Sequence, residues 1–188
     1  MNALLFQRIL LPVDFAPCSR EAFLVGLQLA RQFQAQVFLL HVIDTKSLEA
    51  LNALGLSRPS EEKEQKKRLN HQARILTKGL LSLPEAKGLP ISSIIREGKP
   101  FIEIARTARE EKIDLVVMGS YGGQTGDISH IFFGSTAEKI VRTVPCPVLC
   151  VPYPYHKLRP FTDIDAKAQP ADSEKKGQRR KRSMTANA

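Results

Sequence analysis

Glycine and hydroxyl residues gather behind an apolar run in the second half of the chain, in an arrangement suited to an anion. The group begins at Gly119, includes Gly122, and resumes fifteen residues after Gly119 with Gly134, Ser135 and Thr136. A helix starting at these last residues presents backbone N–H groups that lack partners within the helix, and its dipole favours negative charge. Glycine lets the main chain approach such an anion closely. The pattern therefore predicts a phosphate-binding loop.

The start of that helix is predicted from Ser135 and Glu138, because Ser-x-x-Glu before apolar residues is typical of a capping box with serine as the N-cap. Short glycine motifs also arise by chance, so an exposed turn between a strand and a helix explains the same glycines. The chain lacks a Gly-x-x-x-x-Gly-Lys-Ser/Thr run, and no general base is visible beside the glycines. We therefore predict no catalytic residue, and expect any hydrolysis of a bound nucleotide to be slow.

Cysteines and histidines form no metal or redox motif in this sequence. Cys18, Cys146 and Cys150 are too few for a disulfide framework and lack the Cys-x-x-Cys spacing of a zinc site. The four histidines are scattered without ligand spacing. We expect structural thiols and no metal site, with a redox role as the alternative for the thiols.

The composition is that of an ordinary soluble protein, with 188 residues of which 43% are hydrophobic and 25% charged. This length allows one domain with a sizeable core and a tail. No apolar stretch approaches the roughly 20 residues of a membrane span. The N-terminus has no charged region ahead of its apolar run and no small-residue cleavage site, so we expect a cytoplasmic protein.

Positive charge is concentrated towards the C-terminus. The net charge is +9, and the residues from His156 onward carry nine basic and four acidic side chains, a surplus of +5. The segment 153–188 is rich in proline and charge and cannot bury a core, so we predict a disordered basic tail behind a domain at 1–152. The tail is compatible with contact to nucleic acid or an acidic surface, and equally with a solubilising role.

Short apolar runs and helix-periodic segments alternate along the domain. This order predicts an α/β fold: a single doubly wound five-stranded parallel sheet, Rossmann-like, with helices on both faces. In such folds the ligand lies outside the carboxyl ends of the strands, where the strand order reverses. If strands 1 and 4 are neighbours there, Asp14 and Gly119 face one crevice, which favours the nucleotide interpretation. The predicted strands cover 8–14, 36–42, 90–96, 115–118 and 148–151.

One long helix is predicted from Ser60, after a loop at 44–60 that contains a short helical turn at 48–54. Acidic residues in its first turn favour the helix dipole. Its charged residues are predicted to form a solvated face. The apolar positions at helical spacing, which we expect to face the sheet, are Leu69, Ala73, Leu76 and Leu80.

Several of these stretches resemble the universal stress protein family. The matching residues are Arg8-Ile9-Leu10-Leu11-Pro12-Val13-Asp14-Phe15, His41-Val42, Val117-Met118-Gly119-Ser120-Tyr121-Gly122, Phe133-Gly134-Ser135-Thr136-Ala137-Glu138-Lys139-Ile140-Val141 and Pro145-Cys146-Pro147-Val148-Leu149. The resemblance covers about residues 4–152. It implies a short doubly wound α/β fold and a homodimer that pairs through the last strand, from Val148 to Val151. Pairing would also cover an apolar edge that is otherwise exposed.

The ATP-binding branch of that family carries Gly-x-x-Gly, nine residues, then Gly-Ser or Gly-Thr. The resemblance implies that Asp14 and the main chain near Val42 contact adenine, and that Gly119 and Gly122 lie along ribose and phosphate. In this chain the gap at 123–133 has eleven residues, two more than the pattern. The complete implied nucleotide-binding set is Pro12, Val13, Asp14, Val42, Met118, Gly119, Gly122, Gly134, Ser135 and Thr136.

These features favour a regulatory protein of the stress response that binds ATP, with Mg²⁺, and hydrolyses it slowly or not at all. The alternative is a nucleotide-free protein-interaction module that binds an unknown protein partner through the dimer edge, the 44–60 segment or the tail. An enzyme that activates a substrate with ATP is disfavoured, since the first strand carries no His-x-x-His and no Ser-Gly-Gly loop follows it. ATP, AMP and no nucleotide all remain compatible with the sequence.

Overall fold

The computed structural model describes residues 6–45, 59–121 and 134–153, and the predicted turn at 48–54 and nearly all of the predicted tail lie outside these ranges. The predicted strand boundaries agree with the observed ones to within one residue, and the long helix begins one residue earlier than predicted. The elements are β1 (Arg8–Val13), α1 (Pro17–Phe33), β2 (Gln36–Ile43), α3 (Pro59–Leu81), the 3-10 turn η1 (Pro84–Ala86), β3 (Ile91–Glu97), α4 (Pro100–Glu110), β4 (Leu115–Gly119), α5 (Ser135–Thr143) and β5 (Val148–Val151).

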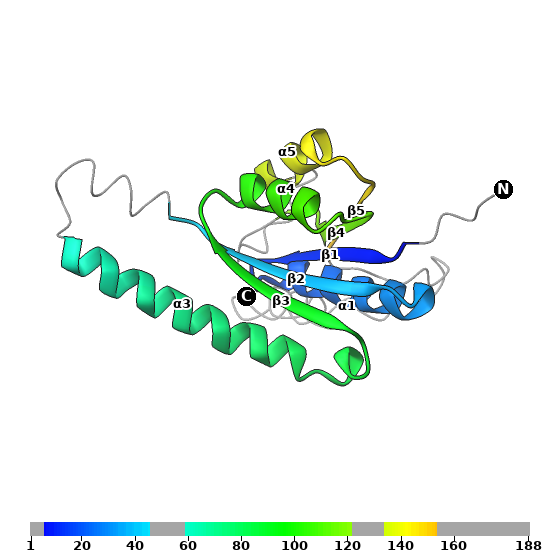
Figure 1. Cartoon of the computed structure of the whole chain (residues 1–188), viewed down its shortest axis with the longest axis horizontal. Coiled ribbons are helices and arrows are strands. Elements are labelled where there is room, and N and C mark those ends of the chain that lie inside the picture. The colour runs from blue at the N-terminus through cyan, green and yellow to red at the C-terminus, as the bar shows by residue number, and fades with distance from the viewer. Residues whose placement is uncertain (1–5, 46–58, 122–133, 154–188) are drawn as a thin grey trace, which may run out of the picture. The chain divides into compact units, whose positions relative to one another are not determined.

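All five strands are parallel and lie in the order β3-β2-β1-β4-β5, which confirms the predicted fold class (Figure 1). The chain builds the sheet outward from β1 to β3, then returns to the other side of β1 with β4. Strand order therefore reverses between β1 and β4, as expected of a doubly wound sheet. The carboxyl ends of these two central strands define the predicted ligand position.

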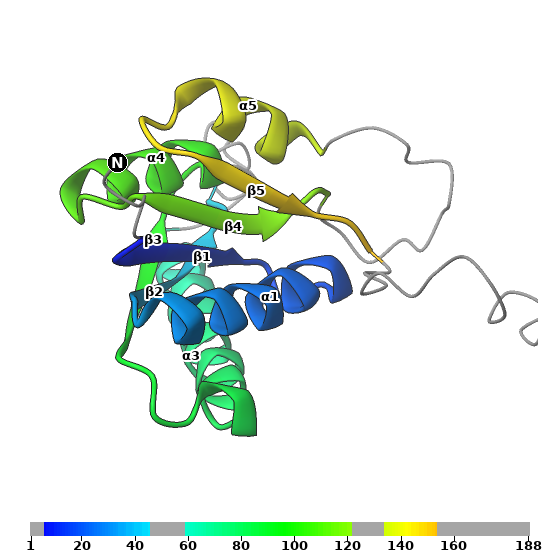
Figure 2. The same ribbon diagram turned by 90° about the vertical axis from the view of Figure 1, so that its right-hand side faces the viewer.

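Helices cover both faces of the sheet, with α1 and α3 on one side and α4 and α5 on the other (Figure 2). Successive residues of β1 point to opposite faces, so Leu11 packs with Phe23 of α1, while Leu10 packs with Ile104 of α4 and Ile140 of α5. Leu10 and Leu11 are both 0% exposed. Each such aliphatic side chain stabilises the fold by about 1.5–3 kcal/mol through burial. This two-sided burial explains why the central strands read as continuous apolar runs.

Helix α1 lies very close to the sheet at Gly26. A Cβ atom at this position would lie 2.2 Å from Cδ2 of Leu11, well inside van der Waals contact. Gly26 lies on the buried face of α1 together with Phe23, Leu27 and Ala30, which recur at helical spacing. This face packs against the sheet.

The side chains that helix α3 buries differ in part from the predicted ones. Leu76 was expected to face the sheet but is 40% exposed, and Ile75 is 57% exposed. The buried side chains are Ala73 and Thr77, with Leu80 partly buried. Because α3 packs against the β2 and β3 part of the sheet, only a narrow strip of the helix finds an apolar neighbour, and a hydrophobic period alone does not reveal where that strip lies.

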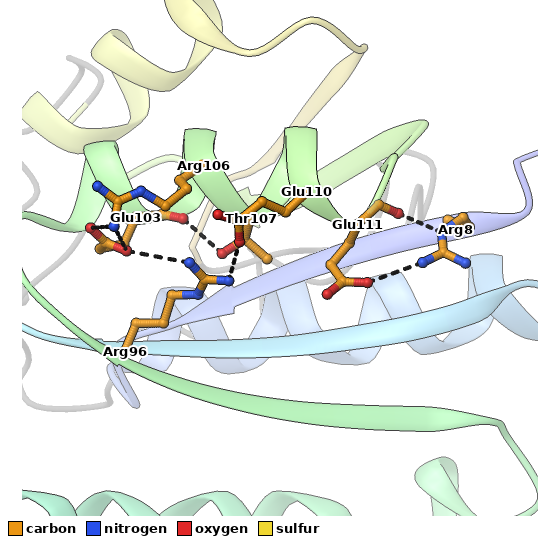
Figure 3. A network of polar contacts seen from close by, with 7 residues as sticks. All are labelled: Arg8, Arg96, Glu103, Arg106, Thr107, Glu110 and Glu111. Atoms are coloured by element: carbon orange, nitrogen blue, oxygen red, sulfur yellow. Dashed lines mark hydrogen bonds and ion pairs between the residues drawn. The ribbon is translucent and has the colours of Figure 1, made fainter.

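Ion pairs fasten α4 to the sheet (Figure 3). The carboxylate of Glu103 is buried and lies 3.6 Å from Arg96 of β3 and 3.0 Å from Arg106. Arg96 also binds Glu110, about two helical turns further along α4. A buried carboxylate is tolerated when it is paired in this way. Arg96 therefore connects β3 to both halves of α4.

Candidate functional site

A cavity of about 320 Å³ lies at the carboxyl ends of the central strands. Small-molecule sites in proteins typically begin at about this volume. Its wall is built from the ends of β1, β2 and β4 and from the N-terminal ends of α1, α4 and α5. It thus occupies the position at which the strand order reverses, where doubly wound sheets hold their ligands.

Nine of the ten predicted nucleotide-binding residues line this one cavity, and the tenth, Gly122, lies outside the described residues. The structure thereby brings together side chains that are more than 120 positions apart in the chain. Their role in binding a nucleotide stays a prediction. The nine residues are Pro12, Val13, Asp14, Val42, Met118, Gly119, Gly134, Ser135 and Thr136.

Sequence reasoning missed six further lining residues: Ser19, Leu40, Pro100, Ile104, Tyr121 and Ala137. Two signals were present in the sequence. Leu40 precedes Val42 by two positions in a strand, so both side chains face the same side of the sheet. Pro100 begins a helix that follows a parallel strand, and such helices start at the carboxyl edge where the ligand lies.

One part of the cavity wall is apolar. Leu40 and Val42 come from β2, Ile104 from α4 and Met118 from β4. The first turn of α4 forms part of this wall but offers the cavity few hydrogen-bond donors. Pro100 has no N–H group, and the N–H groups of residues 102 and 103 both donate to the carbonyl oxygen of Lys99, at 3.0 and 3.1 Å. This part of the cavity therefore suits a flat apolar ring.

Helix α5 supplies the polar part. Gly134 is its N-cap, with an extended backbone, and Ser135 is its first residue, so the predicted capping box with Ser135 as the N-cap is wrong. Gly134 N–H donates to the carbonyl oxygen of Ser120 at 2.8 Å, and this bond sets where the helix begins. Glu138 does not reach back to the N-cap and instead pairs with Arg142 at 3.0 Å.

No side chain in the described part of the chain caps α5, and residues 135–137 all line the cavity. Their backbone N–H groups are those that an α-helix leaves without an internal partner. Ser135 and Thr136, which both carry a hydroxyl group, line this same part of the cavity. Because no lysine or arginine is among the described lining residues, an anion here would be stabilised by N–H groups and the helix dipole.

Gly119 allows β4 to end directly against the first turn of α1. A Cβ atom at Gly119 would lie 2.8 Å from Sγ of Cys18, 3.1 Å from the carbonyl carbon of Cys18 and 3.2 Å from the backbone nitrogen of Ser19. Two of these atoms belong to the backbone and cannot move aside easily. The glycine is therefore required for packing, independently of any ligand.

Asp14 is exposed at the mouth of the cavity and holds the turn that follows β1. Its Oδ1 accepts a hydrogen bond from Ala16 N–H at 3.0 Å, while its own N–H donates to Oγ of Ser19 at 3.3 Å. The N-cap of α1 is Ala16, which makes no side-chain capping bond. Asp14 thus makes no capping bond to the first turn of α1.

The same turn contains a strained residue. Phe15 has φ of 65°, a left-handed conformation that costs a non-glycine residue about 1–2 kcal/mol. Its ring packs against the imidazole of His41 at a centroid distance of 4.5 Å. Since a carbonyl oxygen only accepts, His41 Nδ1 carries the proton that it donates to Val13 O at 2.8 Å. This contact and bond hold the end of β1 to β2 beside the cavity.

Burial raises the pKa of three side chains near the carboxyl end of the sheet. Partial burial, with the neighbouring Cys18 and Tyr153, raises the pKa of Tyr121, whose hydroxyl donates to Tyr153 O at 2.9 Å. Burial is also the main cause that raises the pKa of the Cys146 and Cys150 thiols. Raised thiol pKa values leave little thiolate at neutral pH, which agrees with structural thiols. In the described ranges no cluster of three or more histidine, cysteine or acidic side chains is arranged to hold a metal ion.

The model of the universal stress protein family matches residues 5–152. Universal stress protein MJ0531 of Methanocaldococcus jannaschii is 32% identical over 150 residues, which cover 80% of this chain and 84% of that protein. Protein MJ0577 of the same organism is 29% identical over 162 residues, covering 79% and 96%. Its solved structure aligns with a TM-score of 0.66 at 27% identity, over 79% of this chain and 97% of that one. Within the residues that the structure describes, no helix has the length and apolar character to cross a bilayer.

Proposed function

This chain belongs to the universal stress protein family, and on that premise we propose that its cavity binds an adenine nucleotide, ATP foremost, in a regulatory role. The observation that carries the proposal is the two-part wall of the 320 Å³ cavity. An apolar part built from β2, β4 and α4 meets the uncapped start of α5. A nucleotide has the same division into a flat base and an anionic phosphate chain.

The base fits between the side chains of Val42, Ile104 and Met118. Asp14 stands at the mouth with a carboxylate that accepts hydrogen bonds from an exocyclic amine or a ribose hydroxyl. An adenine offers an amino group where guanine offers a carbonyl oxygen, which a carboxylate repels. Adenine nucleotides should therefore bind better than guanine nucleotides.

The phosphates bind at the N-terminus of α5, where the N–H groups of residues 135–137 lack helical partners. No cationic side chain among the described lining residues shares this charge, so Mg²⁺ from solution accompanies the triphosphate. The described lining carries one carboxylate, that of Asp14, and it already holds the turn to Ala16. We infer slow hydrolysis or none.

Substituting Ser135 with aspartate tests the phosphate position. A carboxylate at the first turn of α5 favours the helix dipole and should leave the melting temperature unchanged or slightly raised. The same charge repels phosphates, so ATP affinity should fall about ten-fold or more, and adenosine affinity should change less. Isothermal titration of the full chain with ATP and Mg²⁺, and with adenosine, measures both effects.

Ser60→Asp is the matched control, because it adds the same charge to the first turn of α3, away from the cavity. It should leave ATP affinity unchanged. Absence of any heat or thermal stabilisation with ATP in the wild-type chain would remove the proposal, since a ligand that binds only the folded state must stabilise it. ATP binding that Ser135→Asp does not weaken would instead place the phosphates elsewhere.

The second candidate is a nucleotide-free interaction module. Its supporting observation is the gap between Gly122 and Gly134, which is two residues longer than the pattern of the ATP-binding branch. An unchanged melting temperature at millimolar ATP would favour it.

We further infer a homodimer through β5, which forms one edge of the sheet. Leu149 is 40% exposed on this strand, and Val141 on the adjacent helix α5 is 53% exposed. Exposed aliphatic side chains beside a free strand edge favour pairing with a second copy.

A further inference from the structure

The opposite edge of the sheet is formed by β3, which pairs with β2 and with no other strand in the described part of the chain. Two bonds fix the direction of its backbone groups: Val37 N–H donates to Pro90 O at 2.9 Å, and Gly98 N–H donates to Ile43 O at 3.0 Å. In a parallel pair every second residue bonds to the neighbouring strand. The residues whose N–H and C=O groups point away from β2 are therefore Ile91, Ser93, Ile95 and Glu97.

Helix α3 runs beside this edge (Figure 1). Asn70 Nδ2 donates to Oε1 of Glu97 at 2.7 Å, which ties the middle of α3 to the end of β3. An open hollow of about 760 Å³ lies here, larger than the nucleotide cavity. Its lining comes from α3 and Glu97, so the hollow is separate from the site already described.

The hollow is strongly basic. Lys63, Lys67 and Arg74 line it, all of them exposed, and His71 lies among them. Spacings of four and seven residues place these three cations on one side of the helix. The described contacts give none of the three an ion-pair partner, whereas Arg68 on another side of α3 pairs with Glu64. Like charges four residues apart repel one another, so the arrangement weakens the isolated helix and is suited to an acidic partner.

We propose that the β3 edge and the basic side of α3 together bind an extended acidic segment of another protein. The segment adds to β3 as a further strand, and its alternate acidic side chains face Lys67 and Arg74. Strand addition supplies main-chain hydrogen bonds and the alternating side chains supply specificity. Glu97 is the single carboxylate among the described lining residues of the hollow, and the cations there outnumber it.

The positive charge of this surface disfavours a second copy of this chain, or the chain's own C-terminal segment, as the ligand. A second copy of this chain would bring its own basic side against the first, and the segment from His156 onward carries a surplus of +5. Nucleic acid would use the cations but has no strand to pair with β3. An extended acidic peptide is the ligand that uses both features.

A fluorescein-labelled peptide of about ten alternating glutamate and valine residues, titrated into the full chain, tests the proposal by anisotropy. Binding should be accompanied by slower amide hydrogen exchange at Ser93 and Ile95. The same peptide with N-methylated alternate amides should bind at least about ten-fold more weakly, because it cannot pair with the edge. Absence of binding by the unmodified peptide would overturn the proposal.

Arg74→Glu should lower the affinity about ten-fold, since it replaces an attraction with a repulsion. Arg68→Glu changes the net charge equally on another side of the same helix and should change the affinity less than about two-fold. Equal losses in both variants would mean that only net charge acts, and would overturn the proposal. Binding of an oligonucleotide that is equally sensitive to Arg74→Glu, with no protection of Ser93 by the peptide, would identify a polyanion surface instead.

Discussion

At the scale of single residues, Gly119 has two explanations that the sequence alone does not distinguish: contact with a ligand, and close packing against α1. As part of a glycine motif it predicts contact with a ligand, yet in the structure it is already required by the backbone of Cys18 and Ser19. A glycine at this position favours close packing with or without a nucleotide. Its presence therefore carries less functional weight than the uncapped start of α5, which the fold alone does not require.

Gly119→Ala should lower the free energy of unfolding by about 1–3 kcal/mol, because the added Cβ would lie 3.1 Å from the carbonyl carbon of Cys18. Urea unfolding of the apo protein measures this effect. Gly79→Ala is the control: a Cβ there would meet nothing within 4 Å, so alanine should be neutral or stabilising in the helix. Equal stability of wild type and Gly119→Ala would contradict the packing explanation.

At the scale of elements, the position of α4 depends on a polar anchor as much as on apolar packing. Arg96 binds two acidic side chains of α4 that lie about two turns apart, and one of them, Glu103, is only 6% exposed. The first two turns of the same helix contribute Pro100 and Ile104 to the cavity wall. The anchor therefore also shapes the apolar part of the site.

Arg96→Met should destabilise the protein by about 1–3 kcal/mol, since it leaves a buried carboxylate with one partner fewer. Arg106→Met removes the more exposed partner, 54% exposed, and should cost about 0–1 kcal/mol. Chemical denaturation of both variants gives the comparison. A larger loss for Arg106→Met would show that Glu103 depends chiefly on the exposed partner.

The sequence was sufficient to predict elements whose signal is local. Leu10 and Leu11 lie in a run buried on both faces, and the parallel arrangement of the strands follows from regular alternation with helices, whereas the order β3-β2-β1-β4-β5 was not predicted. The start of α5 was predicted wrongly because a backbone bond to Ser120, rather than the side chain of Ser135, determines the N-cap. Ile104 was missed as a site residue because its helical period shows only that it is buried, and not that it also borders a cavity.

At the scale of the whole molecule, the two edges of the sheet differ in chemistry. The β5 edge has exposed aliphatic side chains and suits a second copy, whereas the β3 edge lies beside cations and suits an acidic partner. The two proposed interfaces lie on opposite sides of a five-stranded sheet and do not compete. A dimer would therefore present two copies of the basic edge, which increases avidity for a partner with two acidic segments.

Leu149→Asp should convert the dimer to a monomer, because it places a charge on the exposed side of the β5 edge. Val148 is a poorer choice for this test, since its side chain packs against the core formed with α4 and α5. Light scattering after size exclusion measures the mass. Ile75→Asp, at an exposed aliphatic residue of α3, is the control and should leave the mass unchanged. A monomeric wild-type chain would contradict the inferred dimer.

The bond between Gly134 N–H and Ser120 O affects how far the length of the segment between them can change during evolution. It closes a segment of thirteen residues, 121–133, where the ATP-binding pattern corresponds to eleven. By loop-closure entropy, this difference in length costs only about 0.15 kcal/mol. Apart from Tyr121, the described residues that line the cavity lie outside this segment, so insertions or deletions within 122–133 should leave the spacing of Gly119 and Ser135 in space unchanged. Length in this segment is free to vary, while the bond holds the backbones of Ser120 and Gly134 at a fixed distance.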